Sequence, residues 1–554
     1  MSEPPAATAA APVAAGDEIV WLGLARKWWV MAVTTPSVVL AEVAVTALLL
    51  SNTLILQGLD TDMYRYQWAT GPYLVLLILA PLLSVPLVAS YGSQRTFLAG
   101  AVLAGAGFVV AALAESLYAM IAARLLMSAK GLVLAVALSQ MWLAFPRRKG
   151  LAMAVVNAAT YGGLFVGTAV GGFLEFQTSW RSIYGVAGVT FLVLAITGHR
   201  ALVRDQPAQP VPLRLNPLEI LLLTASIAVA VFVVLRGQYF GWFDSNLVAF
   251  SIAGGTLAFA GFVWTTLTST DPLVNLRLAG FRTLALTLPV IALFAGAAVG
   301  MLITLPSYLQ LRGYPSVVEG WILFFPGVAI LSSCLASGFL YGRKTNLVAL
   351  WAGLASSLAG GLWFLQADLY TAKATVSAML CVWAAGAGLV FPTALRLTFS
   401  GQNAAAVRQL AGVKVALRSS ATLLLAFTAV VIIQRGTDVG QDSLGQRVNR
   451  NNPAYAQVLE RVEQHVVSRG SAPAIAKEQA AGVVGSWVAH NAQAVGQRAG
   501  RRFLLAANAL ALLIALFIPL RPEENLLADD ARDFAWGWSD RAQPRSVTQS
   551  GNAS

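Results

Sequence analysis

Long apolar stretches recur along the whole chain, and short polar connections separate them. A helix needs about 20 apolar residues to cross the hydrocarbon core of a membrane, and these stretches have that length. The ten-residue alternation of a transmembrane barrel does not occur. We therefore predict an all-α polytopic membrane protein with about fourteen spans, at residues 31–56, 68–90, 96–114, 117–143, 151–176, 182–199, 217–236, 246–267, 284–309, 317–340, 346–365, 374–396, 411–434 and 502–520.

Composition supports this class. The chain has 554 residues, of which 57% are hydrophobic and 11% charged, whereas soluble domains carry about 25% charged residues. The formal net charge is +12, but the basic residues lie singly or in short groups between apolar stretches. They form no continuous basic face, so we expect no nucleic-acid partner, and membrane topology explains the charge better.

Basic residues are unevenly shared between alternate loops, which predicts the orientation. The loops after every second span hold most of them, and the other loops hold no more than one each. The richer set is expected in the cytoplasm of a cell (inner) membrane protein, with cytoplasmic tails at residues 1–27 and 521–554. The richer loops contain Arg26, Lys27, Arg95, Arg147, Arg148, Lys149, Arg200, Arg204, Arg214, Arg277, Arg282, Arg343, Lys344 and Arg408.

One outer connection, residues 435–501, is long and polar. Within it, Tyr455–Val467 and Ala474–Ala494 place apolar residues at helical spacing. We predict two amphipathic segments standing outside the membrane between the last two spans. A loop without regular structure is the alternative.

The stretch from Arg124 to Tyr184 combines buried charge with close packing. Its first span contains Arg124 and Lys130, and charges inside a membrane usually serve a function. A basic turn, residues 146–150, leads to a second span with glycines at spacings that put several on one face. Small residues let helices approach closely. We expect a moving part of a transporter here, with Gly163, Gly167, Gly171 and Gly172 among the residues involved in conformational switching.

No pattern of catalytic or cofactor-binding residues is present in the sequence. The three histidines, His199, His465 and His490, lack a second ligand at metal-binding spacing, and no phosphate-binding G-x-x-x-x-G-K-[ST] loop occurs. We therefore expect no enzyme, metal or cofactor. A transporter of this kind takes its energy from an ion gradient or from the substrate gradient.

Several segments, in this order and spacing, resemble the fourteen-span drug:proton antiporters of the major facilitator superfamily, the EmrB/QacA-type exporters. The resemblance implies two six-helix bundles, 28–200 and 284–520, with a linker and an inserted helix pair at 201–283. It also implies proton-driven export of amphipathic compounds by alternating access. The segments are Gln67–Leu74, Ser139–Gln140, Phe145–Ala154, Gly167–Gly172, Ser179–Arg181, Arg236–Gln238, Asp271–Leu273, Leu305–Gln310 and Gly320–Gly327.

Two departures from the family pattern weaken part of that implication. The loop between the second and third spans keeps Gly92 and Arg95, which we also assign to switching, but has Ala89 near the usual acidic position. The Gly-Pro of the fifth-span signature is Gly167-Thr168 here. Losing that proline removes a point where a helix kinks readily.

Four intramembrane charges are the candidates for proton coupling and substrate contact: Glu42, Arg124, Lys130 and Arg418. Glu42 lies where the family usually has an aspartate, and it could exchange a proton or contact a cationic drug. Arg124 and Arg418 resemble family arginines in their spans. Structural ion pairing is the alternative for Arg124, and interfacial anchoring is the alternative for Arg418 and its neighbour Lys414. If Lys130 faces the cavity, it favours anionic substrates.

Four aromatic residues are candidates to line an apolar cavity: Tyr73, Tyr161, Tyr308 and Phe325. Aromatics near span ends are more often interface anchors, which is the alternative for these four. The expected partners are a small-molecule substrate, protons and membrane lipid. In a two-membrane bacterium, the resemblance also implies a periplasmic adaptor and an outer-membrane channel. Two alternative functions remain open, namely export of an endogenous anion such as a siderophore or aromatic acid, and a non-transporting sensor or assembly platform.

Overall fold

The structure is a computed structural model, and all regular structure among its described residues is helical. It describes residues 24–50, 52–146, 148–177, 179–202, 213, 215–269, 272–275, 282–340, 342–400, 402, 404–448, 453–470 and 472–519. The predicted tail 521–554 and most of the predicted tail 1–27 lie outside these residues.

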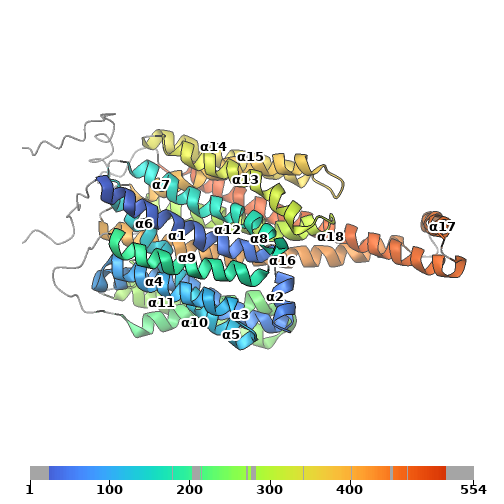
Figure 1. The fold of residues 1–554 in the computed structure, drawn as a ribbon, viewed down its shortest axis with the longest axis horizontal. Helices are drawn as coiled ribbons and strands as arrows, with labels where there is room; N and C mark the ends of the chain where they lie inside the picture. The colour runs from blue at the N-terminus through green and yellow to red at the C-terminus, as the bar shows by residue number, and fades with distance from the viewer. Residues whose placement is uncertain are drawn as a thin grey trace, which may run out of the picture.

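The helices run nearly parallel in one bundle (Figure 1). Thirteen helical stretches in the described part of the chain are long and apolar enough to cross a membrane. They match thirteen of the fourteen predicted spans; the first, 31–56, falls on two helices and is not among the thirteen. The predicted all-α membrane fold is confirmed. The first half contains α1 (Leu24–Leu50), α2 (Asn52–Gly58), α3 (Met63–Tyr91), α4 (Ser93–Ala112), α5 (Leu117–Met127), α6 (Lys130–Ala144), α7 (Lys149–Asn157), α8 (Gly163–Gln177) and α9 (Trp180–Ala201).

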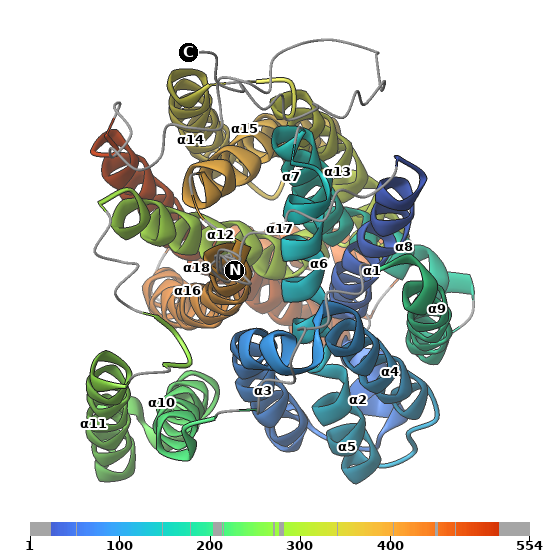
Figure 2. The ribbon, with the colours of Figure 1, turned by 90° about the vertical axis from the view of Figure 1, so that its left-hand side faces the viewer.

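In the second half, as in the first, successive spans run in opposite directions along the bundle (Figure 1). Two helices that connect the halves, α10 (Pro217–Arg236) and α11 (Asn246–Thr268), pack on each other at the margin of the bundle (Figure 2). The remaining helices are α12 (Arg282–Gln310), α13 (Ser316–Ser337), α14 (Arg343–Leu365), α15 (Lys373–Phe399), α16 (Ala404–Arg447), α17 (Pro453–Ser468) and α18 (Pro473–Leu516).

The helices α1–α9 pack mainly on one another, as do α12–α18. Contacts between the two groups run along α8 with α13, and along α16 with α3 and α6. We call the end of the bundle where α6 ends and α7 begins the turn end. The opposite end, where α16 and α18 extend beyond the other helices, is the hairpin end (Figure 1).

The last two long helices extend well past the membrane. Both α16 and α18 have 44 residues, and at 1.5 Å per residue each is about 66 Å long, roughly twice the hydrocarbon thickness. The predicted segment Ala474–Ala494 is therefore continuous with the last span, and Tyr455–Val467 is α17 at the tip. The two extensions pack closely at Gly436 and Gly496, a contact that we call the seam. A Cβ on Gly436 would lie only 2.9 Å from the Gly496 Cα. This seam explains why the connection is helical rather than irregular.

Two spans contain local breaks that the apolar pattern did not predict. The span of α5 and α6 is interrupted at Ser128 and Ala129. Between α7 and α8, residues Ala158–Gly162 form one turn of π-helix. Such π-turns are rare and often lie at functional sites.

Two glycines hold matching turns at the turn end of the two halves. Gly92, between α3 and α4, has φ 83° and ψ 159°, and Gly342, before α14, has φ 84° and ψ 154°. Only glycine adopts this backbone region without strain. The shared conformation shows that the two halves repeat the same turn, and Arg95 is exposed beside the first one.

The predicted glycine ladder of α8 faces α1. A Cβ on Gly163 would lie 3.5 Å from the Glu42 Cβ, one on Gly167 would lie 2.8 Å from the Val43 Cα, and one on Gly171 would overlap the Ala47 backbone. Their spacing of four residues puts them on one face. Gly172 is also buried. The ladder therefore sets the distance between two helices of the same half.

Replacing the turn glycines should destabilise the protein. Gly92→Ala and Gly342→Ala each place a side chain in a backbone region costing about 1–3 kcal/mol, so the thermal unfolding temperature of the purified protein should fall. Gly254→Ala is the control, because a Cβ there meets nothing within 4 Å. An unchanged unfolding temperature in both turn variants would contradict the strained-turn assignment.

Substitution in the α8 ladder should separate α8 from α1. Gly171→Ala adds a Cβ that would meet the Ala47 carbonyl and Cα, so we expect destabilisation by roughly 1–3 kcal/mol from overpacking. Denaturant or thermal unfolding of purified protein measures the loss, and Gly254→Ala again serves as control. Wild-type stability of Gly171→Ala would show that the two helices are not closely packed there.

Candidate functional site

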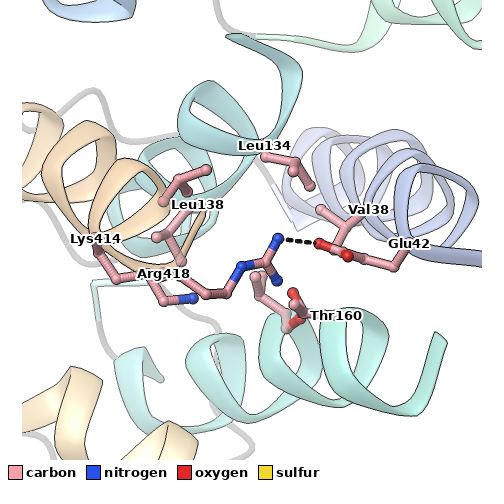
Figure 3. Close-up of a pocket in the computed structure, with 9 residues that line it drawn as sticks. Val38, Glu42, Leu134, Leu138, Thr160, Lys414 and Arg418 are labelled. Carbon is pink, nitrogen blue, oxygen red and sulfur yellow. Dashed lines mark hydrogen bonds and ion pairs between the residues drawn. The ribbon is translucent and has the colours of Figure 1, made fainter. Parts of the chain in front are cut away.

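An ion pair joins the two halves near the middle of the bundle. An Arg418 Nη2 of α16 donates to a Glu42 Oε1 of α1 at 2.5 Å, across 376 residues of sequence (Figure 3). Glu42 is 4% exposed and Arg418 is 8% exposed. Buried charges are tolerated when they are paired. The structure thus brings together two of the four predicted charges.

The pair lines a small cavity between the two groups of helices. Its volume is about 10 Å³, close to the minimum for one water molecule. Most of the wall is apolar, and the Thr160 hydroxyl in that wall donates to the Val156 carbonyl. The other lining residues are Val38, Leu134, Leu138, Lys414 and Val415. An organic molecule can enter only if the halves separate.

Lys414 is the second cation on this wall. It lies one helical turn before Arg418 and is 4% exposed, and its side chain runs alongside that of Arg418 (Figure 3). Among the described residues, its ammonium group makes no hydrogen bond or ion pair. Its Nζ lies 5.7 Å from the centre of the Tyr161 ring. Lys414 and Arg418 are thus both buried between helices rather than exposed on the outer surface of the bundle.

Tyr161 belongs to the π-turn and contacts the other half. Its ring stacks on that of Phe391 in α15, with centroids 3.3 Å apart and planes 5° apart. The Arg418 guanidinium lies 5.9 Å from the same ring. Of the four aromatic candidates, Tyr161 is thus the one beside the cavity.

Lys130 lies farther toward the hairpin end on the same face of α6 as Leu134 and Leu138. It is 3% exposed, its Nζ donates to the Ala41 carbonyl of α1 at 3.1 Å, and it lies 5.9 Å from the centre of the Tyr73 ring. The Lys130 ammonium group therefore already has a backbone partner and an aromatic neighbour. The backbone partner, Ala41, directly precedes Glu42 in α1.

Arg124 is held inside the first half, away from the cavity. Its Nη1 donates to the Thr70 Oγ1 at 3.0 Å, and its Nη2 donates to the Tyr66 hydroxyl. Its guanidinium also lies over the Tyr66 ring at 4.7 Å. The structure places Arg124 between α5 and α3, where it joins helices of one half.

Two aromatic candidates lie elsewhere. The Tyr308 hydroxyl donates to the Asp368 carbonyl at 2.8 Å near the hairpin end of the second half. Phe325 of α13 is 55% exposed. Neither residue contributes to the cavity wall.

An apolar layer closes the turn end below the cavity. It draws side chains from both halves, including Leu138, Met153, Leu395 and Leu410. The Trp142 ring packs edge-on against Phe399, with centroids 5.3 Å apart. In this structure the cavity is therefore sealed from the turn end.

Sequence reasoning paired Lys414 with Arg418 but did not place it among the four candidate charges, and it missed Thr160. The spacing of Lys414 and Arg418, one turn apart in an apolar span, was the available signal, since it puts both on one helix face. No sequence signal marked Thr160 or the π-turn. Among the described residues, no group of three or more His, Cys, Asp or Glu side chains could hold a metal ion.

Comparison with known proteins identifies relatives among resistance and export proteins. The chain is 27% identical over 332 residues to the tetracenomycin C resistance and export protein of Streptomyces glaucescens, covering 57% of this chain and 59% of that protein. It is 29% identical over 312 residues to the multidrug resistance protein Stp of Mycobacterium tuberculosis, covering 53% and 55%. The chain thus spans little more than half the length of these relatives.

The fold matches that of the human organic anion transporter MFSD10 (TETRAN), with a TM-score of 0.54 and 14% sequence identity over 88% of this chain and 99% of that one. The family model of the Major Facilitator Superfamily matches residues 34–425. This match covers the first half, the α10–α11 pair and most of the second half. The chain therefore belongs to the major facilitator superfamily.

Proposed function

We propose that this protein is a secondary active exporter of amphipathic organic compounds, driven by proton antiport. Family membership and the relatives indicate a multi-pass membrane transporter of small molecules rather than an enzyme. Its relatives include proteins named for export of tetracenomycin C and for resistance to lincomycin and puromycin. We assign the chain to the fourteen-span drug:proton antiporters, as its motifs suggest.

The buried Glu42–Arg418 pair is the observation that carries this proposal. It links α1 to α16, so it links the two halves that must separate to admit a substrate. Protonation of Glu42 removes its negative charge and with it the electrostatic attraction between the helices. Arg418 then loses its partner in a medium of low dielectric, where an unpaired charge is costly. A proton can thereby change which arrangement of the halves is stable.

Alternating access follows from this switch in our proposal. The helices α1–α9 and α12–α18 act as two bundles that rock about the central cavity, as in other secondary transporters, while α10 and α11 form an inserted pair. The π-turn at Ala158–Gly162 provides a point where this span can bend. In relatives that keep the Gly-Pro signature, the proline would provide that point. Gly162 contacts Leu331 of the second half, so bending there alters the interface between the bundles.

The same proposal fixes the orientation. The turn end, with its basic loops, faces the cytoplasm of a cell (inner) membrane protein, and both chain ends are cytoplasmic. The extensions of α16 and α18 then stand on the outer side. In a two-membrane host, an adaptor subunit would meet the protein on this hairpin.

Glu42→Gln should uncouple transport from the proton gradient, because an amide cannot exchange a proton at this position. We expect the part of efflux that depends on the proton gradient to be lost. Efflux of tetracenomycin C, puromycin and lincomycin from proteoliposomes, with and without an imposed pH gradient, measures this effect.

The matched control is Glu219→Gln. Glu219 is buried in α10, accepts hydrogen bonds from Thr266 and Leu273, and lies outside the cavity. It should keep the response to the gradient. A full response in Glu42→Gln would remove Glu42 from the mechanism, and wild-type efflux indifferent to the gradient would reject proton antiport.

The ion pair should also show coupled stability. Arg418→Gln leaves Glu42 buried without its partner, which we expect to cost about 3–5 kcal/mol. The double variant Glu42→Gln/Arg418→Gln removes both charges and should recover most of that loss. Unfolding of the wild type, both single variants and the double variant completes the cycle. Additive losses would mean that the two side chains do not interact.

A further inference from the structure

Lys414 is a buried cation that the coupling mechanism leaves unused. It lines the cavity between the halves, is 4% exposed and makes no ion pair or hydrogen bond with any described residue. An ammonium group without a partner is expensive to keep out of water. Its position beside a cavity between the halves, rather than within packed side chains, puts it where a ligand could reach it once the halves separate.

The charges around the interface do not balance. Three cations lie in succession along it, Lys414 and Arg418 on α16 and Lys130 on α6, and Glu42 is the carboxylate among them. Arg418 already holds Glu42 at 2.5 Å. Lys130 is turned to the Ala41 carbonyl at 3.1 Å. The unbalanced positive charge at the cavity is therefore that of Lys414.

The walls around this charge are apolar. Val38, Leu138, Val156 and Val415 line the cavity with it, and Tyr161 lies at its edge. Such a combination suits a ligand with an apolar body and one anionic group, because pockets of this kind use a few polar groups to orient a largely hydrophobic ligand. A strongly hydrated inorganic anion would gain nothing from these walls.

We infer that Lys414 is a binding subsite for a carboxylate on the exported compound, so that amphipathic molecules with a carboxylate group are preferred over otherwise matched molecules without one. This inference rests on the proposed export function and specifies its substrate class. The carboxylate pairs with the Lys414 ammonium when the halves separate and the cavity opens. Outward movement of an anion from a cell with a negative interior is also electrically favourable.

Charged thiol reagents test the subsite without requiring a known substrate. Thr160→Cys, in a background with Cys334→Ala and Cys381→Ala, places a thiol in the cavity wall of the full-length chain in lipid nanodiscs. Mass spectrometry follows its modification by a sulfonatoethyl and by a trimethylammonioethyl methanethiosulfonate. The ratio of the two rates cancels the reactivity of the thiol itself. Dividing it by the same ratio for free cysteine then cancels the difference in reactivity between the two reagents.

We expect the anionic reagent to react roughly tenfold faster or more, given the attraction between unit charges at short range. Lys414→Gln should abolish this preference and Lys414→Arg should retain it. Lys344→Gln, which removes an exposed lysine at the turn end, should leave the ratio unchanged. A ratio at or below one, a ratio insensitive to Lys414→Gln, or exclusion of both reagents would overturn the proposal.

Transport of a matched dye pair separates this inference from the proposed function. A rhodamine with a free carboxylate and its methyl ester differ only at the anionic group. Proteoliposomes with wild-type protein should export the acid faster, and Lys414→Gln should remove that advantage while sparing the ester. Equal export of both dyes would overturn the carboxylate specificity and leave the exporter intact. Absence of all transport, with the reagent preference preserved, would reject the export function and leave the subsite.

Discussion

An isolated charge is costly in a membrane interior, and this constraint shapes the structure. The Glu42–Arg418 pair satisfies it by joining α1 to α16, the first span of one half and a late span of the other. Among the described residues, neither side chain forms an ion pair within its own half. The halves are therefore most stable when they are together around the pair, and any movement that separates them must neutralise or re-partner these two groups.

Arginines elsewhere satisfy the same constraint without carboxylates, by donating to carbonyl groups at helix ends. Arg181 donates to the Ala112 and Ala114 carbonyls at the end of α4, and Arg501 donates to the Phe364 carbonyl near the end of α14. The last carbonyls of a helix lack partners within it and carry partial negative charge. These contacts fix helices within one half. By contrast, the Glu42–Arg418 pair joins side chains from the two halves, and under the proposed antiport a proton on Glu42 would weaken it.

The spans were predictable because about 20 apolar residues suffice to define each one. The pairing of Glu42 with Arg418 was not, since 376 residues separate them and helix position alone does not set which faces meet. Lys414 shared a face with Arg418 in the sequence, yet its burial depends on the packing of α6 and α1 around it. The continuous helices beyond the membrane depend on the seam of Gly436 and Gly496, which is visible only once α16 and α18 are paired. The residues of the π-turn, Ala158–Gly162, show no sequence pattern that distinguishes them from ordinary α-helix.

Glu42 contacts both the glycine ladder of α8 and its ion-pair partner Arg418. Gly163 lets α8 approach α1 so closely that a Cβ there would lie 3.5 Å from the Glu42 Cβ. The absent side chain thus helps to bury the carboxylate, and burial strengthens its dependence on Arg418. The π-turn lies immediately before Gly163, so a change in its winding would rotate or shift α8 along α1. Such a shift would alter the exposure of Glu42 to water, and under the proposed antiport this is how helix movement and protonation of Glu42 would be linked.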